Sequence, residues 1–386
     1  MDWMNCKKIM RSLLVAGMAL SMTMSQAMAK DSSLQISWYP EVYTMHAGQD
    51  SLLSNNARQQ IKDAISARLK DLAAAGKLPF TVKQGASGSL SNVQESFSDD
   101  VPLSLLPIVV VDESFDTHIT IGDTSAWRHV IASGLNIAIC SAGTADDAGM
   151  KMLAVVPLSG YTVIGDPNEN GGKIMPKALT DSQKSNAYAA LSVAMIKDMD
   201  FNTVAKALKN WQRDKVSPVT TQVADVKISS KKAQGIFHGQ GLQLRNLIAN
   251  VYSAEYQKAT GNLVMPPRIS AAFQQQAQKN MYAFEMHCPS GKVMMSMGEP
   301  GKTVVLDFSG AAEAEVTGKK ASNIRKDILY KAWLKKTTDD GKEVVLDDYM
   351  VEPQFKKAGS NIEVDKKDIY ARLEMKLAKK MAAQKR

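Results

Sequence analysis

The chain has 386 residues, of which 45% are hydrophobic and 22% charged, the composition of a soluble globular protein. Lysine and arginine number 47 against 39 aspartates and glutamates, a formal net charge of +8. The excess is concentrated between Lys366 and Arg386. The body of the chain is therefore about neutral. The net positive charge of the whole chain does not indicate a nucleic-acid-binding protein.

The first 29 residues predict a secretory signal peptide. Basic residues within the first eleven positions precede an apolar run over residues 13–24, and Ala27 and Ala29 then form a small-residue cleavage site. The run is about 12 residues long, whereas a spanning helix needs about 20; an uncleaved N-terminal anchor is the alternative. No cysteine follows the run, so lipid attachment is not expected. We therefore predict cleavage near Ala29 and a periplasmic or secreted protein without a transmembrane span.

Residues 30–217 predict an N-terminal α+β domain. A strand at LQISW (34–38) is followed by a helix whose apolar residues recur every three or four positions, ended by Gly76. Several strand patterns then follow one another from residue 103, ending in a hairpin about Ser159-Gly160. Strands without intervening helices indicate an antiparallel sheet. Helices are predicted over 181–213.

Residues 218–235 are predicted to be a linker or an edge strand at a domain boundary, and residues 236–364 form the second α+β domain. The clearest hairpin of the chain lies at 328–352, where a D-G turn joins two arms of alternating polarity. A basic amphipathic helix over 365–386 closes the chain. The predicted fold class is α+β, with two domains of mixed, largely antiparallel sheets and flanking helices.

Two cysteines remain after signal removal, Cys140 and Cys288, both in apolar strand-like surroundings. An oxidising compartment allows one disulfide between them. It would close a loop of about 150 residues and contribute about 4–5 kcal/mol in the chain-entropy model. Two buried thiols are the alternative. No C-x-x-C pair occurs, so neither a zinc ribbon nor a redox motif is predicted.

Sequence motifs give no support for an enzyme or a cofactor. The five histidines include no H-E-x-x-H pattern, and no G-x-S-x-G elbow occurs. A non-enzymatic role is therefore preferred, and no cofactor or metal is predicted. The alternative is a secreted hydrolase whose site is assembled from scattered residues near the first sheet, with Asp116, His118 and His129 as candidates.

The C-terminal helix combines a narrow apolar stripe with a surrounding positive charge. Ile369, Leu373, Leu377 and Met381 recur every four residues. The candidate residues for binding an anionic surface are Lys366, Lys367, Arg372, Lys376, Lys379, Lys380, Lys385 and Arg386. The alternative is a helix that packs its stripe on the domain and leaves its charges in water. The surface-binding interpretation predicts that deleting 366–386 leaves the body folded.

The strand–helix–strand opening and the LVMPPRI passage (263–269) between two predicted helices resemble periplasmic α/β domains of envelope-assembly proteins. Examples are the N-terminal domain of the Tol-system β-propeller protein and curli-secretion proteins. The resemblance includes no diagnostic motif and implies no site residue. Together with the leader, it predicts a bacterial envelope protein with a binding, assembly or scaffold role. The expected partner is an envelope protein or an anionic envelope surface, and no nucleic acid.

Overall fold

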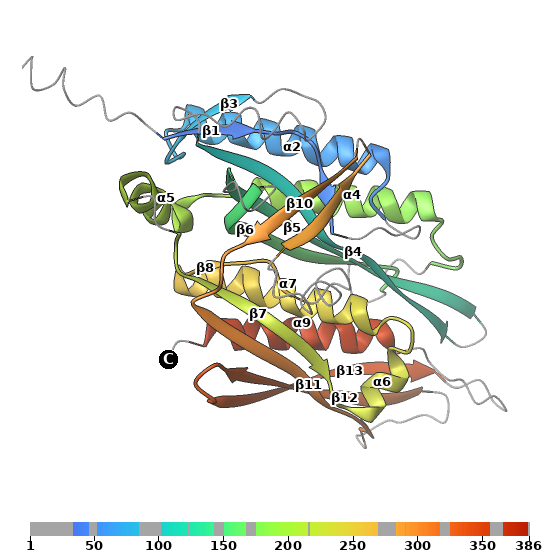
Figure 1. Cartoon of the computed structure of the whole chain (residues 1–386). Helices are drawn as coiled ribbons and strands as arrows, with labels where there is room; N and C mark the ends of the chain where they lie inside the picture. Colours follow the sequence, from blue (N-terminus) through green and yellow to red (C-terminus); the bar gives the residue numbers. More distant parts are fainter. Residues whose placement is uncertain are drawn as a thin grey trace, which may run out of the picture. The chain divides into compact units, whose positions relative to one another are not determined.

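The protein is known from a computed structural model in which residues Gln35–Arg386 cluster into one compact unit. The structure describes residues 34–45, 52–84, 102–121, 124–142, 150–166, 175–214, 217–268, 283–289, 291–316, 325–355 and 366–384. The predicted signal peptide, all but the first residue of the helix predicted at 268–280 after Pro267, and the basic residues Lys385 and Arg386 lie outside these segments. Figure 1 shows the arrangement of the described elements.

The described strands form one mixed thirteen-stranded sheet. They are β1 (Gln35–Trp38), β2 (Tyr43–Thr44), β3 (Thr81–Gln84), β4 (Leu103–Ile121), β5 (Thr124–Ala142), β6 (Met150–Ile164), β7 (Thr220–Ile228), β8 (Leu263–Val264), β9 (Ala283–Cys288), β10 (Gly291–Met297), β11 (Lys302–Glu315), β12 (Arg325–Thr338) and β13 (Glu343–Phe355). The longest ladders, β4–β5–β6 and β11–β12–β13, are antiparallel, whereas β7 pairs with β11 in parallel.

The described residues also form helices, and together with the sheet these confirm the α+β class. They are α2 (Asn55–Ala74), α4 (Asp181–Lys197), α5 (Asn202–Asp214), α6 (Lys231–Ile236), α7 (Gly241–Thr260) and α9 (Lys367–Ala383). The structure does not show the two predicted domains. The segment 218–235 contains β7, which lies between β8 and β11 in the sheet, and the first residues of α6.

Helices α2 and α4 lie side by side over one face of the β4–β6 strands (Figure 1). Their ends follow from local chemistry, because Ser54 caps α2 and Thr180 forms a capping box with Gln183 at the start of α4. The predicted apolar stripe of α2, which includes Ile61 and Ile65, is buried.

Helices α7 and α9 form a layer of their own between two parts of the sheet (Figure 1). They contact each other, and α9 also contacts β4 on one side and β12 and β13 on the other. Leu247 and Val251 of α7 and Leu373 and Leu377 of α9 are buried in the same apolar cluster. Because strands cover this layer on both sides, α9 is an interior helix and not an appendage.

The predicted hairpin about Ser159-Gly160 is wrong, because β6 runs straight through it and pairs with β5 along its length. Gly160 has another role. A Cβ at this position would lie 2.7 Å from the Met195 sulfur of α4, so the glycine allows close packing of helix on strand. The D-G hairpin between β12 and β13 is confirmed, and Gly341 supplies its positive φ of 79°.

Candidate functional site

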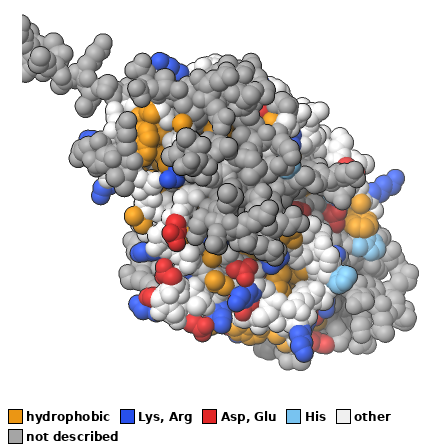
Figure 2. Space-filling view, in the orientation of Figure 1, with side chains coloured by type: hydrophobic (Ala, Val, Ile, Leu, Met, Phe, Trp, Pro, Cys, Tyr) orange, Lys and Arg blue, Asp and Glu red, His pale blue; other side chains and the backbone are white. Residues whose placement is uncertain are grey.

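The predicted basic residues of the C-terminal helix are largely engaged with the chain itself. Lys366 pairs with Glu313, and both Lys376 and Lys380 pair with Asp348. The other described members of the set are Lys367, Arg372 and Lys379. On the face drawn in Figure 2, basic side chains of the described residues are interspersed with acidic ones. Docking of this set on an anionic surface therefore stays a prediction.

Arg372 lies inside a buried cluster of charges that joins α9 to β5, to β13 and to the residues that follow β6. Arg128 of β5 and Arg372 share the carboxylates of Asp166, Glu352 and Asp368. The shortest contacts of the two guanidinium groups with Glu352 are 3.0 Å and 2.8 Å. None of the five residues is more than 8% exposed. The cluster therefore fixes α9 on the sheet by charge pairing as well as by apolar packing.

Helix α9 also carries a buried carboxyl group, that of Glu374, which lies outside this cluster of paired charges. Glu374 is 0% exposed, and neither carboxylate oxygen has a hydrogen-bond partner among the described residues. Burial, and secondarily the charge of Asp307, raises the pKa of the Glu374 carboxyl well above its ordinary value. The folded protein therefore keeps this carboxyl neutral at pH values where the unfolded chain ionises it.

We expect the contribution of Glu374 to the free energy of unfolding to fall as pH rises above about 4.5, because the folded chain keeps a proton on this carboxyl that the unfolded chain releases. The variant Glu374→Met should lack this contribution and should be more stable at neutral pH by about 1–3 kcal/mol. Urea unfolding at a series of pH values measures both effects. Burial beside Asp112 also raises the pKa of Glu113 to about 8. Glu113→Gln removes this second carboxyl of raised pKa and is therefore the matched comparison for Glu374→Met. Identical pH slopes for the native chain and Glu374→Met would contradict this assignment.

The hydrolase candidates are only partly brought together. His129 Nδ1 lies 2.8 Å from the Asp116 carboxylate, and the backbone amide of Leu179 donates to His129 Nε2 at 3.2 Å. His118 instead packs its ring 4.8 Å from that of Trp127. With both ring nitrogens of the fully buried His129 engaged, no lone pair remains to accept a proton from a nucleophile. This geometry is that of a structural histidine.

The two cysteines are not joined by a disulfide in the structure. Cys140 is buried in β5, and burial raises the pKa of its thiol. The Cys288 thiol donates to the carbonyl oxygen of Gly291 at 3.3 Å, within the β9–β10 hairpin. The predicted cross-link between the two halves of the chain is therefore absent, and the shared sheet connects them instead.

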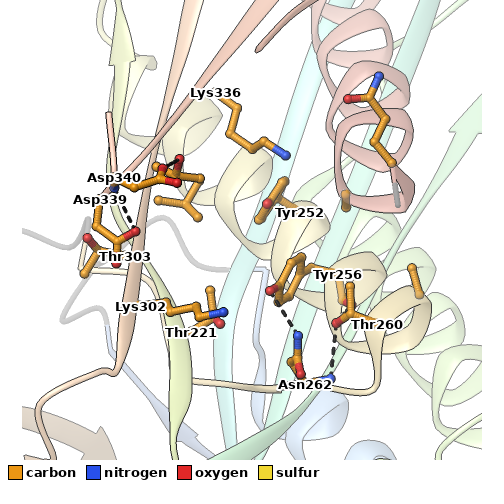
Figure 3. A pocket seen from close by; sticks show the side chains of 15 residues that line it. Thr221, Tyr252, Tyr256, Thr260, Asn262, Lys302, Thr303, Lys336, Asp339 and Asp340 are labelled. Atoms are coloured by element: carbon orange, nitrogen blue, oxygen red, sulfur yellow. Dashed lines mark hydrogen bonds between the residues drawn. The ribbon is translucent and has the colours of Figure 1, made fainter. Parts of the chain in front are cut away.

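The strongest candidate for a functional site is a cleft at the C-terminal ends of α7 and α9 (Figure 3). Its volume is about 780 Å³, a size typical of ligand pockets. The start of β11, the end of β12 and the following turn form its other walls. The lining residues are Thr221, Tyr252, Tyr256, Ala259, Thr260, Asn262, Lys302, Thr303, Val304, Lys336, Thr338, Asp339, Asp340, Ala382 and Gln384.

An aromatic pair forms the α7 wall of the cleft. The rings of Tyr252 and Tyr256, one helical turn apart, are stacked with centroids 5.7 Å apart. Gly261 ends the helix in the left-handed conformation, with a φ of 68°. This turn directs Asn262 back toward the helix, and its side-chain amide donates to the Tyr256 hydroxyl at 3.2 Å. The tyrosine hydroxyl is thereby held at the cleft.

Lys302 and Lys336 bring positive charge to the opposite wall, and Figure 3 shows both side chains extending toward the tyrosines. Lys336 is only 5% exposed. Sequence reasoning missed it, although a signal was present. The inward face of β12 reads Tyr330, Ala332, Leu334, and the next inward position carries a lysine where the alternation predicts an apolar residue.

Comparison with known proteins does not assign this chain to a family. No protein-family model matches it, and the search of curated proteins found no similar sequence. None of the described helices combines the length and the apolar character needed to cross a membrane. The site must therefore be interpreted from its own residues.

Proposed function

We propose that this chain is an exported protein of the bacterial envelope with a non-enzymatic role, and that it binds a small polar ligand in the cleft between α7, α9, β11 and β12. The single observation that carries the binding role is this cleft of about 780 Å³, into which tyrosine and lysine side chains project. The predicted leader supports export, and the resemblance noted in the sequence supports an envelope location.

Two features support binding in preference to catalysis or surface docking. The Asp116–His129 pair has no free ring nitrogen with which to activate a nucleophile. The basic residues Lys376 and Lys380 already pair with Asp348, so an anionic surface would have to compete with this carboxylate. A cleft of this size needs neither of these groups.

We expect the chain, expressed with its leader in a Gram-negative host, to be recovered from the periplasmic fraction without residues 1–29 and with a bound small molecule. N-terminal sequencing reports the cleavage. Native mass spectrometry, compared with the denatured mass, reports the ligand. An intact leader on protein found in the cytosol would contradict the export part of the proposal.

The matched variants for this experiment are Ala259→Trp and Thr337→Trp. Ala259 lines the cleft on the same face of α7 as Tyr252 and Tyr256, so the larger side chain fills it, whereas Thr337 lies one residue from Lys336 on β12, outside the cleft lining, with its hydroxyl toward Glu343. The extra mass should disappear from the Ala259→Trp protein and remain on the Thr337→Trp protein. Equal occupancy of both variants would show that the ligand binds elsewhere.

A further inference from the structure

The cleft directs hydrogen-bond donors toward its interior, and from this we infer that its ligand is a small organic anion, a carboxylate or a phosphate ester. The inference rests on the proposed function and narrows it to one class of ligand. Lys302 and Lys336 supply two ammonium groups from neighbouring strands (Figure 3). An anion placed between them gains charge-assisted hydrogen bonds, which are stronger than neutral ones.

A third donor comes from the aromatic wall. Because the Tyr256 hydroxyl oxygen accepts a hydrogen bond from the Asn262 amide, its own hydrogen is free to point at a ligand. Lys302 stands across the cleft from this hydroxyl (Figure 3). A carboxylate or phosphate oxygen between the two would therefore accept from an ammonium group on one side and a phenol on the other.

The acidic residues of the lining are used by the turn between β12 and β13. Asp340 accepts hydrogen bonds from the Thr338 hydroxyl and from the backbone amide of Lys342. Asp339 accepts from the backbone amide of Asp340 at 3.0 Å. Figure 3 shows both carboxylates on the side of the turn, away from α7. Hydrogen bonds within the turn thus hold both carboxylates at the rim of the cleft, which limits their repulsion of an anion.

The C-terminal end of α7 would also repel an anion if its carbonyl groups were exposed to the cleft. Two of its last carbonyl groups accept hydrogen bonds from within the helix end. The backbone amide of Gly261 donates to the backbone carbonyl of Gln257 at 2.9 Å, and the Thr260 hydroxyl donates to the backbone carbonyl of Tyr256 at 2.7 Å. This capping reduces the negative potential that these two carbonyl groups direct at the cleft.

The volume of the cleft indicates an organic ligand and not a simple inorganic ion. A free phosphate would fill only a small part of about 780 Å³. The hydroxyl group of Thr221 and the ring of Tyr256 line the remaining space, and these groups suit a polar carbon skeleton that carries the anionic group.

Isothermal titration calorimetry of the mature chain tests this with four probes of different charge. Citrate and glycerol 3-phosphate represent the two kinds of anion, mannitol a neutral polyol, and putrescine a cation. We expect at least one anion to bind and the polyol and the diamine not to bind. The ratio of the two anion affinities identifies the carboxylate or the phosphate as the preferred group.

The matched variants are Lys302→Gln and Lys335→Gln, which remove the same charge. Lys335 neighbours Lys336 but lies on the other face of β12, where it pairs with Glu343. Lys302→Gln should weaken anion binding about tenfold, the effect of losing one charge-assisted hydrogen bond, and Lys335→Gln should leave it unchanged. Lys336→Gln should weaken binding further. Lys302 is exposed, so its variant remains informative if Lys336→Gln does not fold.

Equal weakening by Lys302→Gln and Lys335→Gln would show a general charge effect and overturn the inference. Binding of mannitol or putrescine alone, or of none of the four probes, would overturn it as well. The proposed function is judged separately, by the molecule that is bound to the native periplasmic protein and absent from the Ala259→Trp protein. If that molecule is neutral or cationic, the proposed function stands and the inference of an anionic ligand is refuted.

Discussion

A chain that ends at residue 365 is expected not to fold, because α9 is part of the protein interior. Ile369, Tyr370, Leu373, Leu377 and Met381 are each at most 2% exposed. Full burial of a large apolar side chain stabilises a protein by about 1.5–3 kcal/mol. Five such side chains therefore contribute about as much as the 5–15 kcal/mol by which a typical domain is stable. The interpretation of this segment as a dispensable tail predicted the opposite.

Circular dichroism during thermal unfolding and limited proteolysis distinguish the two expectations. A chain ending at residue 384 is the matched control, because it loses the basic residues Lys385 and Arg386 but keeps all of α9. We expect the control to unfold cooperatively like the full chain and the longer deletion to show no cooperative transition. A cooperative transition near the native temperature in the longer deletion would restore the view of a separate tail.

Sequence reasoning succeeded where structure is determined locally. The helix α2 was predicted from the spacing of Ile61, Ile65 and Leu69 and from the glycine that ends it, all within one segment. The β12–β13 hairpin was predicted from its D-G turn for the same reason. These elements need no information about distant parts of the chain.

The arrangement of these elements could not be predicted in the same way. Apolar alternation shows that a strand has a buried face, but it does not show which strand lies beside it. The parallel pairing of β7 with β11 joins residues about eighty positions apart, so the segment containing β7 resembled a linker. The apolar stripe of α9 indicated burial on one side only, whereas the structure covers this helix with strands on two sides.

The candidate cleft escaped prediction for a related reason. Its lining comes from the ends of α7, α9, β11 and β12, and no two of these elements share a recognisable motif. Lys336 is informative in retrospect, because a lysine at an inward position of a strand requires a polar environment nearby. That observation becomes available only when the register of β12 is known.

Replacing Arg128 by methionine is expected to destabilise the fold by about 3–5 kcal/mol, because removal of one partner leaves buried charges uncompensated. In the native cluster two guanidinium groups face three carboxylates. The variant would leave Arg372 alone with all three. Asp368, which accepts a hydrogen bond from Thr117 at 2.6 Å and is 0% exposed, would lose its contact with Arg128.

Urea unfolding of a double-mutant cycle tests whether this cost arises from charge pairing. Adding Asp368→Asn to Arg128→Met restores the original charge balance and should recover part of the lost stability. The exposed pair Lys331–Asp347 on the neighbouring β12–β13 ladder is the control, and Lys331→Met should cost less than about 1 kcal/mol. Salt should weaken the effect at Lys331 and leave that at Arg128 nearly unchanged, because buried charges are poorly screened. A cost below 1 kcal/mol for Arg128→Met would mean that apolar packing alone holds α9 in place.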